Sequence, residues 1–140
     1  MRDCRTSLIT ALITAINGQS TGLTVYTKIP KGDFSNPINY PFIFISNITD
    51  TEDGTKRQFM YNYELDLEIV YKDVTDKVAM WTTADKIKQI FCNDSPFSLT
   101  GGFEIMQSLL VDTTETEDLM NSQDVDVITI KLRFEIEDKN

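Results

Sequence analysis

The clearest pattern along the chain is a strict alternation of apolar and polar residues over two long stretches. Between Phe59 and Tyr71 every odd position is aromatic or aliphatic, whereas most even positions carry an acid or an amide. The last stretch alternates in the same way, with apolar residues at the even positions from Ile128 to Ile136. A period of two is typical of a β-strand with one buried and one solvated face. We therefore predict two strands here and assign to the core Leu65, Leu67, Ile130, Leu132 and Phe134.

Two other stretches have apolar residues at the spacing of an α-helix. From about Thr6 to Ile16 they recur every three or four positions, which predicts a helix with one apolar stripe. The second stripe consists of Val74, Val78, Trp81, Ala84, Ile87 and Phe91. Asp73 or Thr75 can cap the start of this helix. On this spacing Trp81 lies on the buried stripe, and we assign it to the core.

Three shorter runs complete the predicted order of elements. Leu23–Thr27 and Tyr40–Ile45 are rich in β-branched and aromatic residues, and Phe103–Val111 has a similar character after two glycines. The resulting order is α-β-β-β-α-β-β, with no repeat and no linker that would divide the chain. Consecutive strands without crossover helices favour antiparallel pairing. We expect one α+β domain over residues 1–140, a mostly antiparallel sheet with two helices packed on one face.

The lengths of the two alternating strands are unusual. Thirteen residues at about 3.3 Å each would span roughly 40 Å, whereas an ordinary strand has about 5–6 residues. A domain of this size cannot easily cover such a length. We therefore expect the strand ends to project as hairpins or to be covered by neighbouring subunits, and a strongly bent strand is the alternative.

Length and composition are those of a globular domain, with 140 residues of which 41% are hydrophobic and 25% charged. The chain contains no histidine, which excludes catalysis and metal binding that need an imidazole. The two cysteines, Cys4 and Cys92, form no paired motif and are predicted to be free thiols. The apolar run Leu8–Ile16 is too short to span a membrane and lacks the features of a signal peptide. We expect a soluble protein made inside the cell, without a membrane partner.

Charge is distributed unevenly along the chain. Thirteen basic and 22 acidic residues give a formal net charge of −9, and no lysine or arginine lies between Lys88 and Lys131. We predict two acidic loops, and their carboxylates are candidates for a lumen or an interface: Asp50, Glu52 and Asp53 in the first, and Asp112, Glu115, Glu117, Asp118 and Asp124 in the second. Without clustered bases, tight binding of nucleic-acid phosphates is disfavoured. In a ring of several copies, however, an acidic lumen would repel DNA phosphates and keep DNA from sticking.

Motifs for catalysis or for phosphate binding are absent from the sequence. One row of carboxylates shares a strand face: Glu64, Asp66 and Glu68. These groups could serve acid–base catalysis, but a solvated face paired with Lys131 and Arg133 of a neighbouring strand explains them more simply. The Asp50–Asp53 cluster lacks the spaced ligands of an EF-hand. We predict that the protein is not an enzyme and uses no cofactor or metal.

Several segments, taken in order, resemble the tail terminator, or tail completion, proteins of tailed bacteriophages. They are the N-terminal helix, Val25–Pro30, Tyr40–Ile45, the acidic strand Tyr63–Tyr71, Ala84–Ile87 and Ile130–Ile136. The resemblance implies a structural virion protein that forms a ring, typically a hexamer, at the head-proximal end of the tail tube. It implies the tail tube protein and a head-completion or connector protein as partners, and DNA only as passing cargo.

The same resemblance implies a location in the tail or neck of a virion that is assembled in the cytoplasm of a bacterial host. Two alternatives remain open on the sequence. One is another head–tail connector or tail-tube subunit, since these proteins use comparable small β-rich folds. The other is a monomeric module that binds a cationic protein through its acidic loops.

Overall fold

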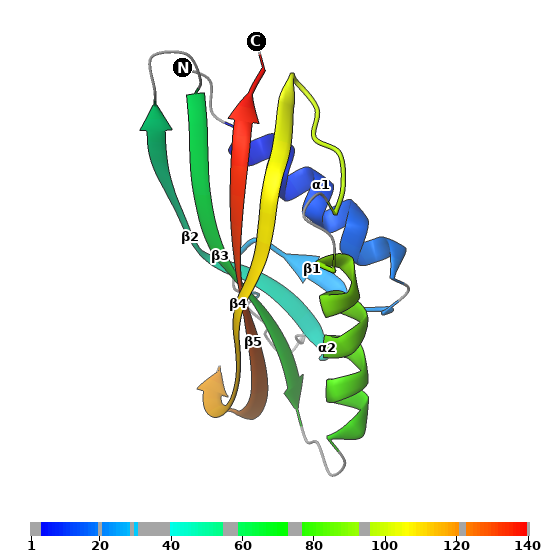
Figure 1. Cartoon of the computed structure of the whole chain (residues 1–140). Coiled ribbons are helices and arrows are strands. Elements are labelled where there is room, and N and C mark those ends of the chain that lie inside the picture. Colours follow the sequence, from blue (N-terminus) through cyan, green and yellow to red (C-terminus); the bar gives the residue numbers. More distant parts are fainter. Residues whose placement is uncertain are drawn as a thin grey trace.

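The computed structural model of the chain describes residues 4–19, 21–28, 30, 40–54, 59–72, 77–92, 96–120 and 123–139. Within them the chain forms two helices and five strands (Figure 1). The elements are α1 (Arg5–Gly18), β1 (Thr24–Tyr26), β2 (Phe42–Gly54), β3 (Phe59–Lys72), α2 (Val78–Ile90), β4 (Phe103–Met120) and β5 (Gln123–Asp138). The predicted order α-β-β-β-α-β-β and the α+β class are confirmed. The predicted caps of α2, Asp73 and Thr75, lie outside the described residues.

The strands form one sheet in the order β1-β2-β3-β5-β4. Only β1 is parallel to its neighbour, through Thr24–Tyr26 alongside Phe42–Phe44, and the other three pairings are antiparallel. The mostly antiparallel sheet is therefore confirmed. The central pair, β3 and β5, aligns the two alternating sequences so that Leu65 faces Leu132 and Leu67 faces Ile130. Because both strands alternate with the same period, one face of the pair is apolar from the row of Tyr61 and Ile136 to the row of Ile69 and Ile128.

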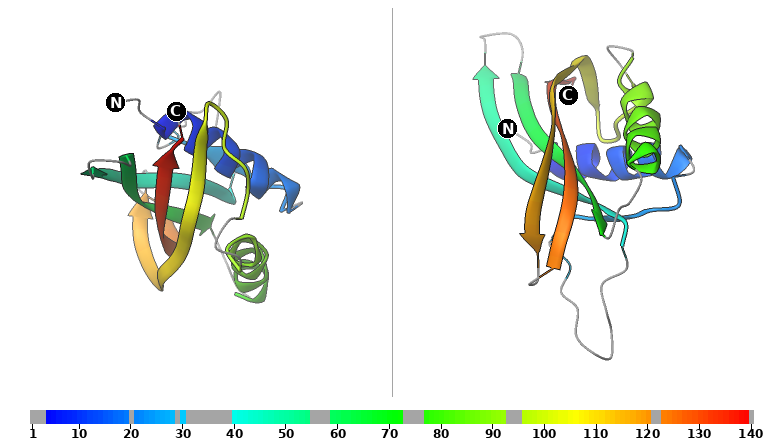
Figure 2. Two further views of the ribbon diagram at one scale, coloured as in Figure 1. Left: turned by 45° about the horizontal axis from the view of Figure 1, so that its top comes forward. Right: turned by 90° about the horizontal axis from the view of Figure 1, so that it is seen from below.

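Both helices cover that apolar face of the sheet, as predicted (Figure 2). The five core residues assigned on the two alternating strands are confirmed, since each is at most 1% exposed. Helix α1 contributes one line of buried side chains: Leu8, Leu12 and Ile16. These positions are four residues apart and therefore lie on one side of the helix. The main core thus lies between the sheet and the two helices.

The assignment of Trp81 to the core is wrong, because its side chain is 49% exposed. The residues of α2 that face the core are Met80, Thr83, Ala84, Ile87 and Ile90. A spacing of three residues drifts round a helix, since each residue turns it by about 100°. Trp81 therefore lies roughly 120° away from Ile87, whereas Met80 lies only about 20° away. Met80 takes the buried place that the sequence spacing gave to Trp81.

The long strands pair as two antiparallel hairpins, β2 with β3 and β4 with β5. Strand β4 has 18 residues and β5 has 16. Gly54 of β2 and Phe59 of β3 lie at one end of the sheet, and Met120 of β4 and Gln123 of β5 lie at the other. Cys4 is buried and Cys92 is exposed, and the two are not joined in a disulfide. Neither described helix is long and apolar enough to cross a membrane.

Candidate functional site

The two acidic segments predicted as loops are parts of strands, so both loop predictions are wrong. Asp50, Glu52 and Asp53 lie in β2. Asp112, Glu115, Glu117 and Asp118 lie in β4, and Asp124 lies in β5. Each residue from Asp112 to Met120 is in register with β5, and each from Thr49 to Gly54 is in register with β3. Threonines alternate with the acids in both segments and favour strands, so a continuous ladder forms despite the polar composition.

The structure does not bring the two acidic segments together. Asp50 faces Tyr63 of β3, whereas Glu115 lies in the row of Ile128 and Ile69. Six residues of β3 separate the two rows, which corresponds to roughly 20 Å at about 3.3 Å per residue. Asp50 is tied to α1 by an ion pair with Arg5, whose Nη2 lies 3.0 Å from Oδ1. The β4–β5 hairpin is thus an acidic surface of its own, at the other end of the sheet.

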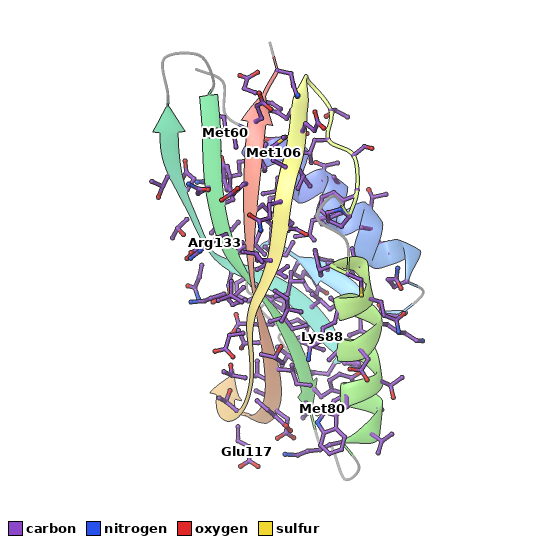
Figure 3. The ribbon with its side chains drawn as sticks, in the orientation of Figure 1. Met60, Met80, Lys88, Met106, Glu117 and Arg133 are labelled. Atoms are coloured by element: carbon purple, nitrogen blue, oxygen red, sulfur yellow. The ribbon has the colours of Figure 1, made fainter. Side chains whose placement is uncertain are left out.

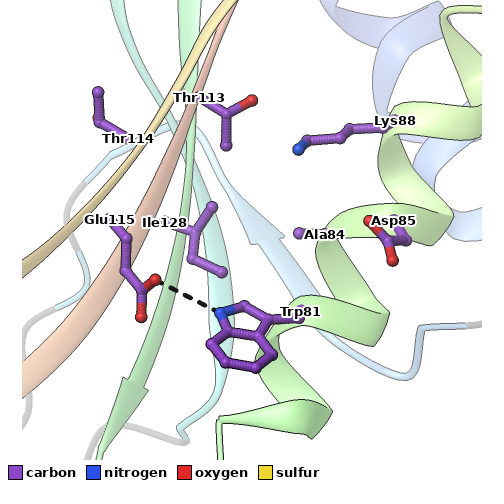
Figure 4. A pocket seen from close by; sticks show the side chains of 8 residues that line it. All are labelled: Trp81, Ala84, Asp85, Lys88, Thr113, Thr114, Glu115 and Ile128. Carbon is purple, nitrogen blue, oxygen red and sulfur yellow. Dashed lines mark hydrogen bonds between the residues drawn. The ribbon is translucent and has the colours of Figure 1, made fainter.

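A groove of about 300 Å³ separates this hairpin from α2 (Figure 4). Its lining consists of Trp81, Ala84, Asp85, Lys88, Thr113, Thr114, Glu115 and Ile128. Glu115 closes one end, because its carboxylate accepts a hydrogen bond from Trp81 Nε1 at 3.4 Å and lies 3.1 Å from Lys77 Nζ. At the other end, Lys88 and Thr113 point toward each other across the gap (Figure 4). The exposed indole of Trp81 is therefore held in place by the hairpin rather than by the core.

The Lys77–Glu115 pair is expected to make stability depend on pH. The Lys77 ammonium lowers the pKa of Glu115, and the Glu115 carboxylate raises the pKa of Lys77, with Asp126 and Glu117 adding to the second effect. The contribution of Glu115 is present above the ordinary glutamate pKa and is lost as pH falls through its lowered pKa. The contribution of Lys77 to stability is present below the ordinary lysine pKa and is lost as pH rises through the raised pKa of Lys77.

Glu115→Gln should therefore be slightly less stable than the wild type at neutral pH, and the difference should vanish in acid. The effect is small because both side chains are exposed and screened by salt. Urea unfolding midpoints measured across pH, at low and high salt, test this. Asp85→Asn, on the other wall of the groove, is the control for the loss of a carboxylate other than the partner of Lys77. An equal stability loss for Glu115→Gln at every pH would contradict the ion pair as its cause.

The carboxylate row of β3 lies on the face of the sheet away from the helices. Its predicted pairing is confirmed for Glu64, whose Oε1 accepts hydrogen bonds from Arg133 Nη2 at 2.6 Å and Nε at 2.9 Å. Asp66 is in register with Lys131, but its carboxylate accepts a bond from Asn47 Nδ2 at 2.8 Å. Glu68 accepts one from Ser46 Oγ at 2.7 Å. Within the described residues, no group of three or more histidine, cysteine or acidic side chains is placed to hold a metal ion.

Exposed apolar side chains mark a second surface, which the sequence reasoning missed. In the described part of the chain, six large apolar residues are 37–56% exposed: Val78, Trp81, Met106, Leu109, Leu110 and Val111. All six lie on α2 or on β4, the two elements that flank the groove. The signal was available in Leu109–Val111, because neighbouring residues of a strand point to opposite faces and three in a row cannot all be buried on one. Met106 and Glu117 lie toward opposite ends of β4, so its apolar and acidic parts are separate (Figure 3).

Comparison with known proteins places the fold. No known family model matches the sequence, and no curated protein matches it. Among solved structures, the fold is similar to that of a chain in the virion of a native gene transfer agent particle, with a TM-score of 0.72. The match covers 98% of this chain and 99% of that chain at 11% sequence identity. The two chains therefore share one α+β fold over nearly their whole lengths.

Proposed function

We propose that this chain is a structural protein of a phage-like virion. More specifically, it forms a ring, typically of six copies, that caps the tail tube at its head-proximal end and joins it to the head–tail connector. The observation that carries the proposal is the likeness of nearly the whole fold to a chain of a gene transfer agent virion. The ordered segments that resemble tail terminator proteins support the position at the end of the tube. Such a protein is part of the tail or neck and assembles in the host cytoplasm.

The charge of the β4–β5 hairpin supports the passage of DNA through such a ring. Asp112, Glu115 and Glu117 are exposed along β4, and no base lies in the sequence between Lys88 and Lys131. A wall of this sign repels DNA phosphates, so DNA would pass without binding. This role requires neither a cofactor nor a catalytic group, and we assign the protein no enzymatic activity.

Light scattering combined with electron microscopy of the purified protein tests the proposal. We expect closed rings with an open centre, and rings bound at one end of tail tubes when the tube protein of the same particle is added. A protein that stays monomeric at every concentration and binds no tube end would contradict the proposed function.

The acidic hairpin also favours the second candidate, a monomeric module that binds a cationic protein. Replacing Glu115, Glu117 and Asp118 together with serine separates the two functions. Ring assembly should survive this change under the first function, because the carboxylates face the lumen. Binding of a cationic partner should be lost under the second. A variant with Asp85 and Glu104 replaced by serine is the control for loss of charge elsewhere, and pull-down together with light scattering gives both readouts.

A further inference from the structure

The described sheet has two open edges on opposite sides. Strand β4 is outermost on one side, and no described strand pairs with its outer edge. On the other side β1 is in register only with Phe42–Phe44 of β2. From Ile45 to Gly54, the outer edge of β2 therefore also lacks a strand partner among the described residues. Backbone donors and acceptors along such edges can pair with another chain.

The edge at β4 is apolar in its middle part. From Met106 to Val111 the strand carries no charge, and four of these six residues are exposed apolar side chains. Bulges between Ile105 and Gln107 and between Leu110 and Asp112 border this part. Edge strands of soluble proteins are usually protected by charged side chains, and an apolar edge without them marks a contact site. The bulges limit any new ladder to about the four residues between them, so buried side chains must supply most of the affinity.

We propose that the β4 edge of one copy pairs antiparallel with the open β2 edge of a second copy. The inference rests on the proposed ring and names the surface that builds it. A second copy is the fitting occupant because the complementary edge lies on the opposite side of the same sheet. A head-to-tail contact of this kind leaves one edge of each type open, so copies can be added until the ring closes.

The faces of the two strands restrict the register of this contact. Leu109, Arg133, Glu64 and Thr49 lie in one row across the sheet, on the face away from the helices. Leu110 faces Leu132 on the helix face, where Ile48 of β2 packs against the main core. A shift of the register by one residue would turn the apolar side chains of β4 to the other face of the sheet. Only shifts by an even number of residues keep them on the helix side. In the level register, each row of one sheet continues into the same row of the next sheet. Leu109 of one copy then lies opposite Thr49 of the next, and Leu110 lies beside Ile48.

Charge complementarity supports the same alignment. Asp112 is exposed and lies in the row of Lys131, Asp66 and Ser46. Beside β2, Thr27 lines a shallow hollow together with Ser46, and the next residue, Lys28, is exposed. The level register therefore brings Asp112 of one copy near Lys28 of the next. Glu68 also lines this hollow, and Lys28 is the group of opposite charge that Asp112 would meet there.

Disulfide trapping tests the pairing directly. In a Cys92→Ser background, Leu109→Cys is combined with Thr49→Cys, or with Thr51→Cys, which lies two residues along the same face. Mild oxidation should give a ladder of covalent oligomers that ends at the size of the ring. The control combines Leu109→Cys with Thr10→Cys on the exposed side of α1 and should give no ladder. Circular dichroism checks that each variant is folded, and folded variants that form a ladder with neither β2 position would overturn the pairing.

A charge exchange supplies a second, independent measurement. Asp112→Lys should raise the subunit concentration needed for half-assembly several-fold, and adding Lys28→Asp should restore it. Rings that form without cross-links and without this rescue would overturn the pairing and leave the proposed function standing. Cross-linked rings that bind no tail tube would support the pairing and contradict the proposed function. Absence of any assembly, with or without tube protein, would contradict both.

Discussion

Replacing Phe134 with alanine is expected to lower the free energy of unfolding by about 3–5 kcal/mol. Phe134 is fully buried, and its ring lies against Phe91 and Phe97, with centroids 6.0 and 6.1 Å away. These contacts join β5 to the end of α2 and to the segment that leads into β4. Truncation would leave a cavity that rigid neighbours cannot fill. Since small domains have about 5–15 kcal/mol of stability in total, the variant should be close to unfolding at room temperature.

Trp81→Ala is the matched control, because it also removes a large aromatic side chain. Trp81 is half exposed, and the alanine variant loses one long hydrogen bond to Glu115 and part of the groove wall. We expect a loss of about 1 kcal/mol or less. Urea unfolding followed by circular dichroism measures both variants without relying on the single tryptophan. Equal losses for the two variants would mean that α2 faces the core through Trp81, as the sequence spacing suggested.

Period-two patterns made the centre of the fold predictable from the sequence. From Tyr61 to Ile69 each apolar side chain on the helix face of β3 has an apolar neighbour on β5, so local pattern and tertiary packing agree. The same agreement holds for α1, whose apolar stripe contains the buried line Leu8, Leu12 and Ile16. Where burial is one-sided and continuous, the period alone identifies the core face.

The wrong predictions concern α2, where the apolar residues do not follow a single helical spacing, and the acidic segments, where the polar composition suggested loops although the residues alternate as in a strand. In α2 apolar residues occur on several sides, and only packing against the sheet selects Met80 over Trp81. In β4 the acids of Thr113–Asp118 suggested a loop, although alternating threonines allowed a strand. The partner that keeps this segment extended is β5, which lies across the hairpin. The register between two strands depends on both segments, so it cannot be predicted from the sequence of one segment alone.

The distribution of exposed groups connects the fold to assembly. The six large exposed apolar side chains of the described residues all belong to α2 and β4, and four of the eight carboxylates predicted to face a lumen or an interface follow on β4. One side of the chain thus offers an apolar edge, and the strand that bears it continues as an acidic hairpin. In a monomer the apolar edge stays exposed to water, whereas a ring can bury the edge and leave the acids facing its channel. On β3, the carboxylates of Glu64, Asp66 and Glu68 bond to different partners and do not converge on one point.

Leu12→Asp is expected to prevent folding altogether. Leu12 is fully buried at the middle of the line by which α1 packs on the sheet. Truncation to alanine alone would cost about 2–5 kcal/mol. A carboxylate at this position adds the cost of burying a charge without a partner, which exceeds the remaining stability of a small domain. Circular dichroism and thermal melts should show the loss of cooperative unfolding, with Leu12→Ala intermediate between the aspartate variant and the wild type.

Thr10→Asp is the control for placing an aspartate in the same helix, since Thr10 is exposed. Its cost should be limited to a helix-propensity difference of at most about 0.7 kcal/mol. A larger loss from Thr10→Asp than from Leu12→Asp would mean that α1 presents another side to the sheet. The contrast also separates folding from assembly, because Thr10 is exposed on α1 and belongs to neither the β2 nor the β4 edge. Thr10→Asp should therefore assemble like the wild type, while Leu12→Asp should fail to assemble because it does not fold.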